Sequence, residues 1–156
     1  MPKASPAEIR KQVALLEETP QRISQYVAGR DEAQLTQTPT NRYWSAVEIL
    51  AHLRSCEEIW TFSIYAMLTE DQPTLPLLDE RRWAKTTLYS TLGFADSFQA
   101  FTLKRAELLR VLRNLPEDAW LKTANIGGRN HSVFSQVRRM ALHEAEHCEQ
   151  FAALLK

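Results

Sequence analysis

Apolar residues recur at the period of an α-helix in nearly every patterned segment of this chain, and helix-starting signals precede them. Ser5-Pro6-Ala7-Glu8 and Ser45-Ala46-Val47-Glu48 are capping boxes, in which a serine and a glutamate three residues later bind free backbone N–H groups. Proline at the first helical position strengthens the first signal. Because no segment shows a convincing strand pattern or an internal repeat, the sequence predicts an all-α fold.

Four long helices are expected. The first runs from residue 6 to about Ala28, and Thr19-Pro20 marks either a kink or a new N-cap within it. The others span residues 46–68, 96–114 and 133–155, the last one capped by Ser132. Residues 70–95 form a long crossover between the second and third helices, with a short helix near 81–89, and residues 115–131 form another connection. Long crossovers let consecutive helices run parallel, so we expect a four-helix bundle that need not be simply up and down.

Composition bounds the function. The chain has 156 residues, which fits one domain spanning 1–156, and its 19 basic residues balance its 19 acidic ones. A neutral chain lacks the field that nucleic-acid binding needs. The N-terminal segment lacks the apolar core of a signal peptide, and the most apolar run, 59–68, is too short to cross a bilayer. We therefore expect a cytoplasmic protein that binds neither nucleic acid nor a membrane.

Three of the four histidines occupy expected helix interiors. His143 and His147 are four residues apart and share one face of the last helix. They lie about 12–18 Å from its end, and His52 lies about 10 Å from the start of the second helix. These heights agree if the two helices are antiparallel, as in an up-down-down-up bundle. Three imidazoles can hold one divalent ion and leave positions open for water or substrate. His131 is too far from them and is expected in a loop.

Three other kinds of metal site share some of these residues. His143-Glu144-x-x-His147 has the letters of a zinc-protease motif, but only nine residues follow it, too few for the usual downstream ligand. A di-iron site needs a second Glu-x-x-His pair, and Glu48 lies four residues before His52 instead of three. A closed zinc site that adds Cys56 to the three histidines stays open.

Further side chains have candidate roles around such an ion. Glu144 is a candidate catalytic base or ligand-orienting group, and Glu48 and Gln150 are candidates to bind the outer N–H of a ligating histidine. Trp44 and Trp60 could line the pocket. The crossover around Arg82 and Trp83 could cover its open side.

Two stretches, YWSAVEILAHL at 43–53 and HEAEHCEQ at 143–150, resemble the DinB-like superfamily of metal-binding four-helix bundles. DERRWAKTTLY and the segment from FADSF to EDAW also resemble the middle of that family. The resemblance implies an up-down-down-up bundle, commonly a homodimer, with one divalent ion, zinc or nickel above others. It implies His52 as first ligand, His143 and His147 as second and third, and Gln150 at a polar position after the last.

Characterised members of that family include S-transferases that use bacillithiol, mycothiol or glutathione, and others are described as metal-dependent hydrolases. The resemblance thus implies a metal-dependent enzyme acting on a small molecule, either a low-molecular-weight-thiol S-transferase with the thiol as co-substrate or a hydrolase. The alternative is a non-catalytic bundle that the ion stabilises, or an interaction protein. A metalloprotease is the least favoured function.

Overall fold

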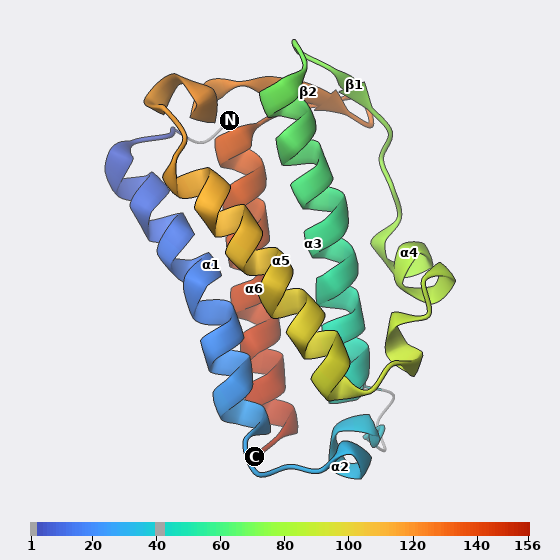
Figure 1. The fold of residues 1–156 in the computed structure, drawn as a ribbon. Coiled ribbons are helices and arrows are strands. Elements are labelled where there is room, and N and C mark those ends of the chain that lie inside the picture. The colour runs from blue at the N-terminus through green and yellow to red at the C-terminus, as the bar shows by residue number, and fades with distance from the viewer. Residues whose placement is uncertain (1–2, 40–42) are drawn as a thin grey trace.

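The computed structural model describes residues 3–39 and 43–156, and four long helices dominate it (Figure 1). The helices are α1 (Pro6–Val27), α2 (Glu32–Thr36), α3 (Ala46–Thr69), α4 (Glu80–Thr86), α5 (Phe94–Arg113) and α6 (Val133–Leu154). The predicted four-helix bundle, built from α1, α3, α5 and α6, is confirmed. Two apolar clusters of buried side chains fill it. No helix among the described residues is long and apolar enough to span a membrane.

Contacts between the long helices fix their directions. Along α3, His52 lies beside His147 and Trp60 lies beside His143, so α3 and α6 are antiparallel. Arg54 binds Ser97 and Glu57 pairs with Arg105, so α3 and α5 run the same way. Figure 1 shows the chain descending along α1, rising along α3 and α5, and descending along α6. This is the up-down-down-up order that the heights of the histidines required.

Capping explains where the helices begin. Ser45 Oγ accepts a hydrogen bond from Glu48 N at 3.2 Å, and Glu48 Oε2 accepts one from Ser45 N at 2.7 Å, which closes the box that opens α3. Ser132 and Ser135 form the same reciprocal pair at α6. An Asp31–Gln34 box opens α2, a one-turn helix that the sequence pattern did not predict because it is too short to show a period.

Pro20 lies inside α1 and does not start a new helix, since α1 is continuous from Pro6 to Val27. Proline has no N–H, so the Leu16 carbonyl one turn earlier has no helical donor. The Nη1 atom of Arg105 on α5 donates to that carbonyl at 2.8 Å. The helix therefore keeps its course while one of its backbone acceptors binds a side chain from a neighbouring helix.

The expected absence of strands is wrong. Three short strands, β1 (Thr74–Leu75), β2 (Thr123–Ile126) and β3 (Arg129–Ser132), form one sheet in the order β1-β2-β3. β2 and β3 make an antiparallel hairpin whose turn is Gly127-Gly128, both with positive φ (56° and 87°). β1 pairs parallel to β2, which ties the two long connections together. Strands of two to four residues are too short for alternation to be read from sequence. His131, expected in a loop, lies in β3.

The crossover between α3 and α5 is held against α3. Its helix α4 ends at Thr86, earlier than expected, because Leu88 takes a left-handed conformation with φ 58° before the short 3₁₀ turn Tyr89–Thr91. Trp83 Nε1 and Tyr89 Oη both donate to Glu58 Oε2 on α3, at 2.9 and 2.6 Å. These two bonds fix where α4 lies relative to the bundle.

Candidate metal centre

The structure brings His52, His143 and His147 together between α3 and α6. His143 Nε2 lies 3.0 Å from His52 Nε2 and 3.0 Å from His147 Nε2. The three ring centroids are 4.4 to 5.0 Å apart. His143 Nε2 thus lies beside the Nε2 atoms of two other histidines, which are 91 and four positions away in the chain.

Hydrogen bonding among the three rings does not account for this arrangement. A single Nε2 carries either one hydrogen or one lone pair, so His143 Nε2 cannot form a full hydrogen bond with both neighbours. Its other nitrogen, Nδ1, is buried and has no partner. Two imidazole nitrogens that bind the same zinc ion at about 2.1 Å stand roughly 3.0–3.4 Å apart, which fits the observed separation. The donor set therefore suits a divalent cation.

The environment keeps the imidazoles of His52 and His143 neutral, the form that binds metal. Burial, and after it the proximity of His147, lowers the pKa of His52 to about 4. Burial, and after it His147 and His52, lowers the pKa of His143 to about 3. Both rings thus present lone pairs at neutral pH.

Gln150 contacts the outer nitrogen of a histidine in the cluster, as the sequence suggested, whereas Glu48 caps α3. Gln150 Oε1 is 2.7 Å from His147 Nδ1, so this amide oxygen can accept the Nδ1 hydrogen and leave the Nε2 lone pair facing the other histidines. The Glu48 carboxylate instead binds the Ser45 backbone N–H as part of the α3 cap.

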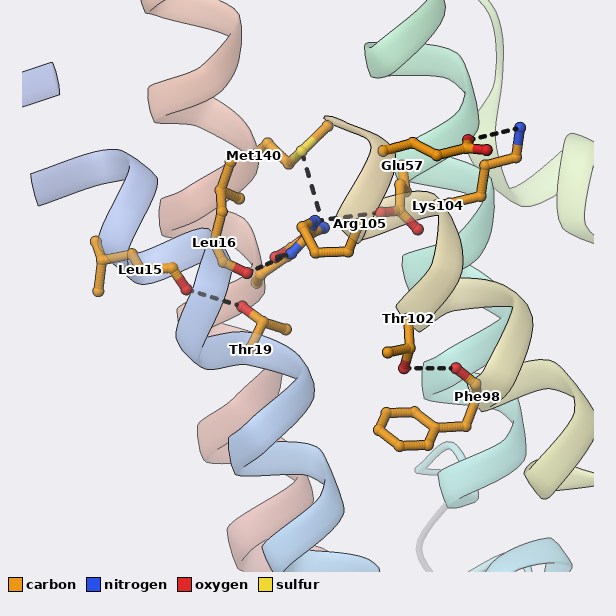
Figure 2. Close-up of polar contacts among 11 residues, drawn as sticks. Leu15, Leu16, Thr19, Glu57, Phe98, Thr102, Lys104, Arg105 and Met140 are labelled. Carbon is orange, nitrogen blue, oxygen red and sulfur yellow. Dashed lines mark hydrogen bonds and ion pairs between the residues drawn. The ribbon is translucent and has the colours of Figure 1, made fainter. Parts of the chain in front are cut away.

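Glu144 is turned into the bundle interior. Its carboxylate accepts two hydrogen bonds from the Arg105 guanidinium, one of them 2.8 Å from Nη1 to Oε2, and both side chains are almost fully buried. Arg105 also binds the Leu16 carbonyl and lies 3.2 Å, through Nε, from Glu57 Oε1. Figure 2 shows Arg105 among Leu16, Glu57 and Met140, which come from α1, α3 and α6. These contacts favour a structural role for Glu144 and do not support the suggested catalytic one.

Glu57 is the weaker partner of Arg105. The Arg105 Nε and Glu57 Oε1 atoms are within ion-pair distance, but neither atom forms a hydrogen bond. One guanidinium thus faces two buried carboxylates and binds one of them better. Burial raises the pKa of Glu57 to about 8, against the opposing effect of Arg105.

Cys56 lies on the buried side of the histidines. Its Sγ is 3.6 Å from His52 Nε2, and possible ligand atoms of His52, Cys56 and His143 all lie within 4.8 Å of one another. Burial raises the pKa of this thiol, so the uncharged form is favoured. The position keeps the Cys–His₃ alternative geometrically possible, but the thiol is not in the open pocket described next.

A pocket of about 370 Å³ opens over the histidines. Its walls are Tyr43, Trp44, His52, Arg81, His143, His147 and Gln150. The Trp44 ring is stacked near His147, with centroids 6.4 Å apart and planes 14° apart, and Trp60 packs edge-on against His143 at 4.9 Å. Trp44 therefore lines the pocket as suggested, while Trp60 supports it from the core. From the crossover it is Arg81 that lines the pocket; Trp83, by contrast, binds Glu58.

Sequence reasoning missed Arg105 and Arg81. Arg105 lies four residues after Phe101 and three before Leu108, within the apolar face of α5, and a charged residue in such a face is a signal of a buried ion pair. The position of Arg81 depends on how the crossover folds back, for which no local signal exists.

Comparisons with known proteins show the family and the fold that this chain shares. The family model of the DinB superfamily matches residues 15–151, a range that contains all three histidines. A solved structure, YfiT from Bacillus subtilis, superposes with a TM-score of 0.87 at 18% identity, over 99% of this chain and 89% of that one. YfiT is described as "a probable metal-dependent hydrolase with an unusual four-helix bundle topology", and at this identity the likeness shows a common fold. A comparison with curated proteins finds no match. On the extent of the family match, the chain belongs to the DinB superfamily.

Proposed function

We propose that this protein is a divalent-metal-dependent enzyme in which His52, His143 and His147 hold the ion. The observation that carries the proposal is the convergence of three Nε2 atoms, two pairs of them 3.0 Å apart, at the floor of an open pocket. A closed structural site would have its fourth side turned to protein. Here that side adjoins a cavity of about 370 Å³, which suits a small-molecule substrate.

The residues around the histidines have distinct tasks in this proposal. Gln150 fixes the tautomer and the ring orientation of His147. Trp44 and Trp60 restrict the movement of the imidazoles and limit the access of water. A bound divalent ion would supply Lewis acidity, which lowers the pKa of a water or thiol that it binds.

Two reaction classes suit this site. Hydrolysis is supported by the fold shared with YfiT, described as a probable metal-dependent hydrolase. S-transfer from a low-molecular-weight thiol is supported by the walls of the pocket, which contain no carboxylate among the described residues. A divalent ion held by the histidines would favour ionisation of a thiol without a separate base, so this second reaction fits the pocket's composition well. Zinc and nickel are the ions we would test first.

The experiment is elemental analysis of untagged protein after supplementation with Zn²⁺ or Ni²⁺. We expect about one ion per chain in the wild type, and loss of the ion in His52→Ala and in His147→Ala with the helical circular dichroism unchanged. His131→Ala is the matched control, since His131 lies in β3 and is not among the pocket residues. Metal-loaded protein is then assayed against ester and amide substrates, and against electrophiles in the presence of bacillithiol, mycothiol or glutathione.

An absence of bound metal in the supplemented wild type would refute the proposal. Loss of the ion in the His131→Ala control would show that the cluster is not the binding site. A stoichiometric ion that small thiols cannot reach, and whose removal unfolds the chain, would instead assign a structural role to the metal.

A further inference from the structure

Arg81 is held at the mouth of the histidine pocket. Asp79 caps α4 by accepting a hydrogen bond from Arg81 N at 3.0 Å, which fixes the backbone there. The Arg81 guanidinium lies over the Trp44 ring, 5.4 Å from its centroid, and lines the pocket together with the three histidines. The cation is thus placed by both its backbone and an aromatic wall.

The charge of Arg81 is not neutralised by a neighbour. The adjacent Glu80 binds Trp60 Nε1 at 3.1 Å and lies 3.7 Å from Arg139. Within the described part of the chain, no carboxylate lies within ion-pair distance of Arg81, and none lines the pocket. With a divalent ion on its floor, this pocket would carry positive charge from the ion and from Arg81, which favours an anionic ligand.

An apolar cavity of about 380 Å³ adjoins the same pocket. It is lined by Pro39, Tyr43, Trp44, Gln150, Ala153 and Leu154. Tyr43, Trp44 and Gln150 line both cavities, so the two adjoin, and we call them together the cleft: Arg81 and the histidines line one part and the end of α6 lines the other. One end of the cleft is cationic and the other is apolar.

From these features we infer that the cleft binds a carboxylate carried on an apolar body. The carboxylate pairs with Arg81, and the apolar body lies over Trp44 and Tyr43 toward Ala153 and Leu154. The inference rests on the proposed function in that it names the class of substrate or product for the same site. Arg81 then binds the carboxylate of the ligand, and the residues at the end of α6 limit the length of its apolar body.

Isothermal titration calorimetry with four probes tests the inference: octanoate, octanol, octylamine and acetate. Each probe is titrated into zinc-loaded protein and into chelator-treated protein. We expect octanoate to bind more tightly than the other three. In Arg81→Gln, octanoate should bind about five- to tenfold more weakly, with octanol unchanged, because only the charge-assisted contact is lost.

Arg82→Gln is the matched control, since Arg82 is the next residue, is exposed like Arg81 and does not line either cavity. It should bind octanoate like the wild type. Ala153→Trp, which fills the apolar end, should weaken octanoate binding toward the level of acetate while leaving acetate itself unchanged. Together the variants separate the cationic end from the apolar end.

The outcomes distinguish this inference from the proposed function. Equal binding of octanoate and octanol, equal binding by Arg81→Gln and wild type, or no binding of octanoate would each overturn the inference while the measured metal content stands. A protein that binds no metal yet prefers octanoate in an Arg81-dependent manner would support the inference and refute the metal enzyme.

Discussion

Glu144 follows His143 directly in the chain, yet its carboxylate binds Arg105 in the bundle interior while His143 Nε2 lies 3.0 Å from His52 and His147. Adjacent residues on a helix point about 100° apart, so one turn of α6 serves both the histidine cluster and the core. Within the zinc-protease pattern, His143 therefore belongs to the histidine cluster and Glu144 belongs to the buried ion pair with Arg105.

Glu144→Gln should retain metal and lose stability. Removing the charge leaves Arg105 without its best partner in a buried site, which we expect to cost about 3 kcal/mol in the free energy of unfolding. Urea denaturation and metal analysis measure the two effects. Glu146→Gln, an exposed change on the same helix, should stay within about 0.5 kcal/mol of the wild type. A stable Glu144→Gln protein with no activity would restore the role of catalytic base.

Glu57 should make stability depend on pH. Its pKa is raised from 4.5 to about 8, so between these values the folded chain keeps a proton that the unfolded chain releases. The stabilisation is complete below pH 4.5, falls by roughly 1.4 kcal/mol per pH unit as the pH rises toward 8, and is lost once the pH has risen through 8.

Glutamine at position 57 cannot titrate. The stability of the wild type minus that of Glu57→Gln should therefore fall from pH 5 to pH 8, when both are measured by urea denaturation with a chelator present. A difference that stays flat, or rises, over this range would show that Glu57 is ionised throughout, with Arg105 dominating over burial.

Gln150 should tune metal affinity through His147. Gln150→Ala removes the acceptor of the Nδ1 hydrogen, and we expect affinity to fall about 10- to 100-fold. Gln150→Glu keeps an acceptor and should bind within a few-fold of the wild type. Competition with a chromophoric chelator measures both affinities. If alanine and glutamate weaken binding equally, the orientation of His147 does not depend on this contact.

Pro20 and Arg105 should be energetically coupled. Proline inside a helix typically costs about 3 kcal/mol relative to alanine, but here the acceptor freed by Pro20 binds Arg105. Pro20→Ala should hence stabilise the wild type by less than this amount. In an Arg105→Lys background, which keeps the charge but loses the planar fork, the same change should gain about 1 kcal/mol more. Strictly additive effects on urea unfolding would argue against the coupling.

Much of the fold was predictable because its signals are local. The serine caps and the 3.6-residue period indicated four long helices. Helical rise, combined with the hypothesis that three histidines share one ion, required the antiparallel course of α3 and α6 that brings His52 to His147. The family match and the shared fold support that prediction. The metal-ligand roles themselves remain predictions.

The parts that were not predicted depend on contacts far apart in sequence. Strands of two to four residues show no period, and β1 pairs with β2 some fifty residues away. Glu144 was expected to face the ion because sequence spacing gives the angle around a helix but not which neighbouring helix lies there. The partner that holds the Glu144 carboxylate in the bundle interior is Arg105, which comes from α5.

The parallel pairing of β1 with β2 has a consequence for how such a site can diversify. The floor of the pocket comes from α3 and α6, whereas the rim carrying Arg81 comes from a crossover anchored at one end by the hairpin strand β2 and against α3 by Glu58. Exchange of crossover residues can therefore alter which molecules enter without disturbing the helices that carry the three histidines. Proteins built this way can share one metal chemistry and differ in what they act upon.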